Sequence, residues 1–305
     1  VNALKTKKSG YEFTLAGTPV QTKSGINWDV SLNISTFQDK YDELPPGQSV
    51  YNTFFKKGDR VDKFYGSAFV RTPDGQIIND AAGKPLANPV PQFLGYLNAK
   101  YQWGIYNKIN WKNLSLGFQF DGSVGGVTTD YMHNKTMRGG RNIETAEGAL
   151  GAARKSDNDH AGDPAYPGVY VGEGVVVSNG VAINYDGSTG AVLNYKDLQF
   201  GANTHTTQVQ DYVSKYYGIS EANLMSKTFA KLREVTISYD LPAKWLGKSF
   251  ISKVSLSLVG RNLVYFYKDK RFKDVDLDQY NYSTSGTGLQ SPTTRRYGFN
   301  INVVF

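Results

Sequence analysis

The chain has 305 residues, of which 40% are hydrophobic and 13% aromatic, and it contains 32 glycines and 21 tyrosines. This composition favours many strands joined by loops over a helical domain. Because there is no cysteine, disulfide frameworks, thiol catalysis and cysteine-based zinc sites are excluded. The formal charge of +7 comes from scattered basic residues without the clustered stripe typical of nucleic-acid-binding proteins, so we expect no nucleic-acid partner.

Hydrophobic and polar residues alternate with a period of two in seven segments, which is the pattern of β-strands with one apolar face. In chain order these segments are residues 10–16, 26–35, 93–105, 114–121, 234–241, 254–258 and 297–305. None of the apolar rows contains a charged residue. This absence matters because an Arg or Lys on a lipid-contacting face would cost about 2–4 kcal/mol at the bilayer midplane.

The predicted connections alternate between short and long. The short ones are residues 18–25, 106–112 and 242–252, and the long ones are residues 36–92, 122–228 and 267–293. Compact soluble domains rarely carry three long loops at one end, whereas outer-membrane barrels combine tight periplasmic turns with long extracellular loops. If the C-terminus is periplasmic, counting strands backwards places all three long loops outside the cell. We therefore predict that residues 1–305 form an all-β, antiparallel segment of a transmembrane β-barrel.

Seven strands are too few to close a bacterial barrel, which has an even number of strands and at least eight. Open edges would leave unpaired backbone groups in hydrocarbon. We therefore expect the remaining strands to come from sequence upstream of this segment.

Five segments occur in order along the chain: KKSGYEFTL from Lys7 to Leu15, NPVPQF from Asn88 to Phe93, FAKLREVTISYDLP from Phe229 to Pro242, VGRNLVYF from Val259 to Phe266, and RRYGFNINVVF from Arg295 to Phe305. In combination they resemble the C-terminal pattern of the SusC/RagA family of TonB-linked outer-membrane proteins. The region between Thr129 and Val209 follows no pattern of this family.

The resemblance implies a 22-stranded barrel, closed by an N-terminal plug, in the outer membrane of a Gram-negative bacterium of the Bacteroidetes type. It also implies a SusD-like surface lipoprotein over the extracellular mouth and energy supplied through TonB, with the plug and the TonB box upstream of this segment. Such transporters take up glycans or, in some members, peptides, and lipid and lipopolysaccharide surround them. No enzymatic activity is implied.

Two alternatives remain open at this point. One is an outer-membrane porin or adhesin that does not import by TonB. The other is a soluble, carbohydrate-binding β-sandwich, in which Trp28, Phe118 and Phe299 would be buried against a second sheet.

The end of the chain resembles the signal that the barrel-assembly machinery reads. Its residues are Tyr297, Phe299, Ile301, Val303 and Phe305. A regularly alternating strand with an aromatic end can pair at a barrel seam while it presents one apolar face to lipid. Alternatively, Phe305 simply ends a strand.

Catalytic and metal-binding patterns find little support. His133, His160 and His205 all fall in the longest loop without a spacing such as H-E-x-x-H. The Asp274, Asp276 and Asp278 run lacks the glycine and glutamate of a calcium loop. We therefore predict no catalytic residue, cofactor or metal.

The sequence also supports two expectations about individual side chains outside any catalytic or metal site. Arg261 should face the lumen and pair with an acidic group. The longest loop is rich in tyrosine, which can stack on sugars or anchor the packing of the loop itself. These tyrosines are Tyr166, Tyr170, Tyr185, Tyr195, Tyr212, Tyr216 and Tyr217.

Overall fold

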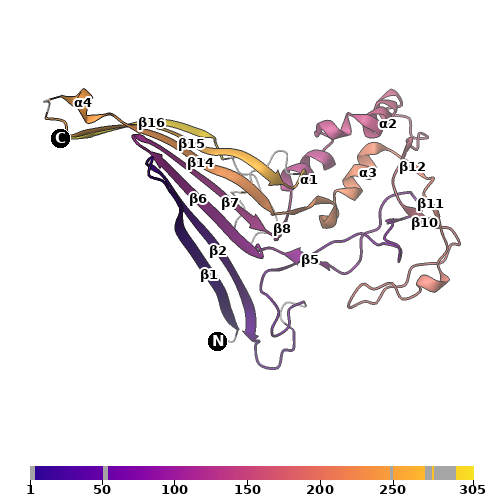
Figure 1. The fold of residues 1–305 in the computed structure, drawn as a ribbon. Coiled ribbons are helices and arrows are strands. Elements are labelled where there is room, and N and C mark those ends of the chain that lie inside the picture. The colour runs from indigo at the N-terminus through magenta and orange to yellow at the C-terminus, as the bar shows by residue number, and fades with distance from the viewer. Residues whose placement is uncertain (1–3, 51–53, 248–249, 272–276, 278–292) are drawn as a thin grey trace.

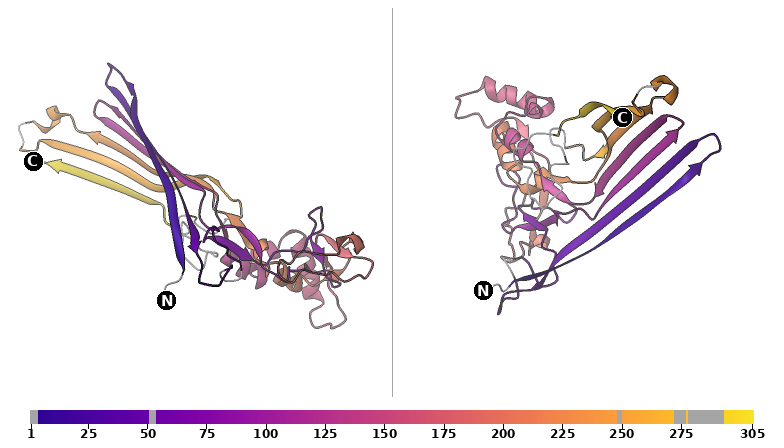
Figure 2. Two further views of the ribbon diagram at one scale, coloured as in Figure 1. Left: turned by 90° about the horizontal axis from the view of Figure 1, so that it is seen from below. Right: turned by 90° about the vertical axis from the view of Figure 1, so that its left-hand side faces the viewer.

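A computed structural model describes residues 4–50, 54–247, 250–271, 277 and 293–305. A single seven-stranded antiparallel sheet organises this part of the chain and curves like a section of a barrel wall (Figures 1 and 2). The number of predicted strands is therefore confirmed. In spatial order the strands are β1 (Lys5–Gln21), β2 (Ile26–Glu43), β6 (Tyr101–Trp111), β7 (Leu114–Val124), β14 (Phe229–Asp240), β15 (Lys253–Lys268) and β16 (Arg296–Val304).

The two ends of the sheet differ as the connection lengths predict, although the connection predicted at residues 106–112 is wrong in its bounds, because the strand before it continues to Trp111. Residues 22–25, 112–113 and 241–252, the last including α4 (Ala243–Leu246), make short connections at one end. The long connections leave from the other end, where the helices of the loops also lie (Figure 1). No helix in the described ranges is both long and apolar enough to cross a membrane.

The predicted strand over residues 93–105 is wrong in its first part. Gln92–Tyr96 (β5) pairs with Lys63–Gly66 (β3) in a separate two-stranded sheet, and β6 begins only at Tyr101. Residues 97–100 separate the two strands, and within β5 Gly95 has a φ of 139°, a conformation that favours glycine. Alternation continues through these residues in the sequence, so periodicity alone could not separate the two strands.

The register places the apolar rows of all seven strands on one face of the sheet and the polar rows on the other. One cross-sheet apolar row consists of Val20, Trp28, Ile109, Leu116, Ile237, Leu258 and Phe299. The neighbouring polar row consists of Gln21, Asn27, Asn110, Ser115, Ser238, Ser257 and Asn300.

The apolar face is not packed against a second sheet. Phe299 is 62% exposed, and Trp28 and Phe118 are only half-buried, with contacts to neighbours in their own sheet. The buried hydrophobic clusters of the described residues lie instead among the long loops, reaching the sheet only where β14 and β15 meet them. The arrangement that a β-sandwich requires is therefore absent from the described part of the chain.

The described residues of 44–100 and 125–228 form one compact unit, which we call the loop body. Its two parts are joined by parallel pairing of β4 with β10, where Ile78 lies beside Val175, and by an ion pair between Arg71 and Glu221 with an N–O distance of 2.8 Å. Its elements are β3, β4 (Ile78–Asn79), β5, β8 (Val127–Thr129), α1 (Tyr131–Arg138), η1 (Ile143–Thr145), α2 (Gly148–Asp159), β9 (Tyr170–Val171), β10 (Val175–Val177), η2 (Tyr195–Asp197), β11 (Phe200–Ala202), β12 (Thr206–Thr207), α3 (Val209–Tyr216), η3 (Ser220–Asn223) and β13 (Leu224–Ser226).

The tyrosines of the loop body pack on one another. Tyr212 is only 4% exposed, and its ring centroid lies 4.8 Å from that of Tyr170 and 5.6 Å from that of Tyr216. Burial raises the pKa of Tyr217 to about 12, which indicates the same apolar surroundings. For this cluster, packing of the loop is the function that the structure supports.

Candidate functional site

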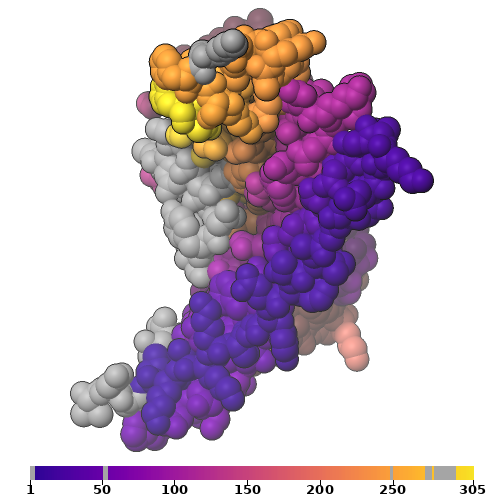
Figure 3. Space-filling model, turned by 60° about the vertical axis from the view of Figure 1, so that its left-hand side comes forward, coloured from indigo at the N-terminus to yellow at the C-terminus, as the bar shows by residue number. Residues whose placement is uncertain are grey.

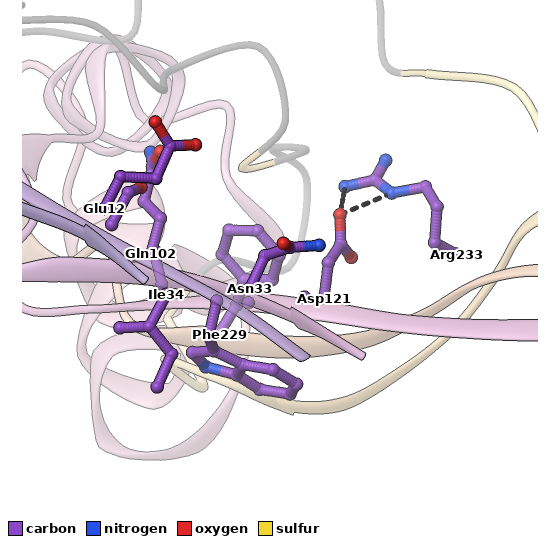
Figure 4. A pocket seen from close by; sticks show the side chains of 12 residues that line it. Glu12, Asn33, Ile34, Gln102, Asp121, Phe229 and Arg233 are labelled. Atoms are coloured by element: carbon purple, nitrogen blue, oxygen red, sulfur yellow. Dashed lines mark hydrogen bonds and ion pairs between the residues drawn. The ribbon is translucent and has the colours of Figure 1, made fainter. Parts of the chain in front are cut away.

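A pocket of about 200 Å³ opens on the polar face of the sheet. Its polar side chains come from five neighbouring strands, so the sheet itself holds them in place. We call it the polar-face pocket, and its polar lining consists of Glu12, Asn33, Ser35, Gln102, Ser123, Asp121 and Arg233. Figure 4 shows Glu12, Gln102 and Asp121 on one side of the strands and Ile34 on the other.

An ion pair crosses this pocket. Arg233 Nη2 lies 2.7 Å from Asp121 Oδ2, and Arg233 Nε donates to the same oxygen at 2.8 Å (Figure 4). Arg233 Nη1 also donates to Asn262 Oδ1 at 2.9 Å. The network thus links β7, β14 and β15.

Two backbone irregularities aim these side chains. The register shifts between Leu232 and Glu234, so Arg233 is the extra residue of a β-bulge. Bulges redirect a side chain that regular alternation would place on the other face. Asn262 has a φ of 56°, and asparagine tolerates this left-handed conformation better than most residues.

Arg261 forms the acidic pairing that the sequence predicts. Its Nε donates to Glu234 Oε2 at 2.7 Å across the β14–β15 ladder, and Thr236 donates a hydroxyl hydrogen bond to the other carboxylate oxygen of Glu234. Because these ions pair with each other, amides, hydroxyls and the Glu12 carboxylate are the groups that this part of the polar face can offer to a solute.

The residues considered for catalysis lie apart from the pocket. His133 contacts Glu144 at 3.3 Å, and His160 stacks on Tyr166 with ring centroids 4.4 Å apart. Within the described ranges, no group of three or more His, Asp or Glu residues could hold a metal ion. The aspartates at positions 274, 276 and 278 lie outside the described residues.

Lys227 joins the two parts of the loop body next to the sheet. The buried Nζ of Lys227 donates to the carbonyl oxygen of Leu97 at 3.0 Å. Asp62 lies nearby, and its Oδ2 is 2.6 Å from Nη2 of Arg60. Burial lowers the pKa of Lys227 to about 8, while the charge of Asp62 acts in the opposite direction. At neutral pH the ammonium therefore remains mostly protonated, and it fixes the chain where the loop body meets β6 and β14.

The predicted assembly signal lies on the outermost strand of the described sheet. Tyr297, Phe299 and Ile301 stand opposite Gly260, Leu258 and Leu256 of β15, and Val303 stands opposite Val254. The ring of Phe305 stacks on that of Phe250, with centroids 5.6 Å apart. Four of the five signal residues are exposed along this edge strand, and Val303 is half-buried.

Sequence reasoning missed two features of the sheet. Asn107 occupies an apolar row, where it is buried and accepts a hydrogen bond from the Trp28 indole at 3.2 Å; no periodic signal identifies it. The bulge at Arg233 did leave a signal, because Leu232 and Val235 share the apolar face although they are separated by three positions instead of two.

Known proteins that resemble this chain in sequence or fold include a receptor and a transporter. No protein-family model matches the sequence. The TonB-dependent receptor P3 of Formosa agariphila is 20% identical over an alignment 342 positions long, which covers 100% of this chain and 29% of that protein. The chain therefore spans less than a third of this relative.

Solved structures show the same fold. The RagAB peptide transporter is 17% identical with a TM-score of 0.59, and the RagAB peptide importer in its closed-closed state is 18% identical with a TM-score of 0.60. Each likeness covers 99% of this chain and 30% of the other chain. The chain thus has the fold of a RagA-type barrel segment, and the resemblance to SusC/RagA-type TonB-linked outer-membrane proteins is confirmed.

Proposed function

We propose that this chain supplies barrel wall and extracellular loops to an outer-membrane, TonB-dependent transporter that imports a nutrient, and that it catalyses no reaction. The continuous apolar face across seven strands carries this proposal. Large apolar side chains such as Phe13, Leu258 and Phe299 are more than half exposed on it. Hydrocarbon is the surrounding that stabilises such a face, whereas the opposite polar face suits a water-filled lumen.

We propose a glycan or oligosaccharide as the imported substrate. The polar face supports this choice because most of its pocket groups are amides and hydroxyls, such as Asn33, Ser35 and Gln102, while Asp121 and Arg233 neutralise each other and Glu12 is the one further carboxylate of the lining. Neutral groups of this kind both donate and accept hydrogen bonds, which matches an uncharged polyol. The structural relatives are named as peptide importers, so a peptide is the alternative that the experiment must separate.

We propose two protein partners as well. A SusD-like lipoprotein would cover the loop body, which offers it an ordered surface at the end of the sheet where the long loops gather (Figure 1). TonB would act through a plug that belongs to the same transporter. An outer-membrane porin or adhesin remains the competing proposal, and it differs in needing neither energy nor TonB.

Fractionation and uptake test these proposals in cells that express the complete coding sequence. We expect the protein to stay in outer membranes washed with alkaline carbonate and to be released by detergent. We expect oligosaccharide uptake that stops when the proton gradient is collapsed or the TonB gene is deleted. Release by carbonate would contradict the barrel, energy-independent uptake would support a porin, and uptake of peptides alone would exclude the glycan.

We also propose that Tyr297, Phe299, Ile301, Val303 and Phe305 act as the assembly signal. Deleting Phe305 should lower the amount of folded barrel several-fold, measured as the heat-modifiable band in outer-membrane fractions. Phe250→Ala is the matched control, because it removes the ring that Phe305 stacks on and leaves the chain end intact. Equal losses in both variants would assign the effect to ring stacking and would overturn the signal.

A further inference from the structure

On the loop side of the apolar belt, the outward face of β1 and β2 carries cations. Lys7 stands directly opposite Lys40 in the β1–β2 ladder, and Lys40 forms a further antiparallel bridge with Arg60. Directly opposed residues in an antiparallel pair project to the same face. Lys7, Lys40 and Arg60 therefore lie side by side, and we call them the cation row.

The cation row continues the lipid-facing rows and not the lumenal ones. On β1 the apolar face runs through Phe13 and Tyr11, and the regular register carries the same parity to Lys7. On β2 the face runs from Ile34 to Lys40 in the same way. Both strands lie at the front of the space-filling view, where nothing described covers them (Figure 3).

Like charges that stand directly opposite each other destabilise a sheet, so this row needs a counter-charge. Of the nearby carboxylates, Glu43 pairs with Lys5 at 2.9 Å, Asp59 with Lys63 at 2.7 Å and Asp62 with Arg60 of the row itself, and Asp39 stands opposite Lys8 on the other face of the ladder. Asp42 acts on Lys5. Within the described ranges, neither Lys7 nor Lys40 forms an ion pair, so an external anion would relieve their repulsion.

The height of the cation row relative to the apolar belt indicates which anions lie beside it. Lys7 lies four residues beyond Tyr11, the last aromatic residue of the belt on β1. At a rise of roughly 3.4 Å per residue and a strand tilt of about 40°, the lysine stands about 10 Å above that ring. Headgroups begin at the edge of the hydrocarbon and extend several ångströms beyond it, so the cations lie at headgroup level.

Aromatic rings accompany the cations at this level. The guanidinium of Arg60 lies 4.0 Å from the ring centroid of Tyr96, and Lys63 Nζ lies 5.9 Å from that of Phe93. Both rings are partly exposed, at 37% and 46%. Exposed aromatics beside basic residues are typical of proteins at a membrane interface, and an aromatic face can also pack on a sugar ring.

We propose that Lys7 and Lys40 bind the phosphate groups of lipopolysaccharide in the outer leaflet, next to Arg60, with Tyr96 and Phe93 beside its sugars. The inference rests on the proposed outer-membrane function. Arg60 is pre-oriented by Asp62 and Tyr96, whereas Lys7 and Lys40 supply the two positive charges that the protein itself leaves uncompensated. A bound phosphate would hold the loop-side end of the β1–β2 hairpin at a set depth in the membrane.

The test is lipopolysaccharide retained by the full-length protein after detergent extraction, quantified by mass spectrometry, together with native mass spectrometry of added lipopolysaccharide. Reversing two charges with Lys7→Glu and Lys40→Glu should weaken binding about tenfold or more. Lys8→Glu is the control for a charge reversal at this height: it reverses a single charge one residue away, on the opposite face, where Lys8 contacts Phe37. Dephosphorylated lipopolysaccharide should bind the wild type as weakly as intact lipopolysaccharide binds the double variant.

The outcomes separate this site from the proposed function. The lipopolysaccharide site would be wrong if the double variant stays in the outer membrane with undiminished lipopolysaccharide, or if Lys8→Glu loses as much lipopolysaccharide as the double variant does. Either result would leave the transporter proposal unaffected. A wild-type protein that does not fractionate with the outer membrane would overturn both. Heat-modifiable mobility of each variant verifies that a loss of lipid does not follow from misfolding.

Discussion

Replacing Phe118 with arginine should lower the free energy of unfolding of the barrel by about 2–4 kcal/mol in lipid vesicles. Phe118 lies on the central strand of the sheet, in the apolar row, opposite Asn107 of β6 and Val235 of β14. An arginine there would place a charge against hydrocarbon near the middle of the belt. Urea unfolding followed by tryptophan fluorescence measures the change.

Gln119→Arg is the control for this substitution. Gln119 is the next residue on the same strand, but it belongs to the polar face and stands opposite Glu234. A cation there meets water and a carboxylate, so we expect a change within about 0.5 kcal/mol. If both variants lose the same stability, the two faces have equivalent surroundings and the lipid-facing assignment is wrong.

Replacing Tyr212 with alanine should open the loop body while the sheet stays folded, with a local cost of about 3–5 kcal/mol. Tyr212 packs with Ala153, Val209 and Val213, and burial raises the pKa of its phenol above the usual range. Its ring also fills the space above Gly172, where any added Cβ would overlap it. Protease added to intact cells should cut within residues 125–228 of this variant faster than of the wild type.

Leu193→Ala provides the comparison within the same loop. Leu193 is 67% exposed, so its truncation creates no cavity and should leave the rate of proteolysis unchanged. Cleavage that is equally fast in both variants would show that the loop is already open, and the buried tyrosine cluster would then not stabilise it. Uptake by the Tyr212→Ala variant should fall if the loop body is the surface on which a lipoprotein partner docks.

Individual residues show how far alternation predicts this fold. Ile26, Trp28, Val30, Leu32 and Ile34 were assigned to one face from sequence, and the β2–β6 register confirms it. The inference succeeded because side chains of an extended strand alternate strictly, and a strand held by two neighbours cannot slip without inverting its faces. Where the chain leaves the sheet, as at residues 97–100, the same alternation persists and the prediction fails.

The polar-face pocket was not predictable from spacing. Glu12, Asn33, Gln102, Asp121 and Arg233 come from five strands spread over more than two hundred residues, and only strand order brings them together. The bulge that turns Arg233 toward Asp121 could be suspected from the three-residue interval between Leu232 and Val235. Its partners could not, because registers between strands depend on turns and side-chain packing.

The linear order of apolar and polar residues was sufficient to predict the number of strands, the residues that share the apolar face and the end from which long loops leave. Each of these follows from the two-residue period of a strand and from the lengths between strands, which are local properties. The compact loop body, the Asp121–Arg233–Asn262 network and the Lys7–Lys40–Arg60 row depended on tertiary structure. They are contacts between residues distant in sequence, and such contacts form only when strand pairing and loop packing bring the residues together.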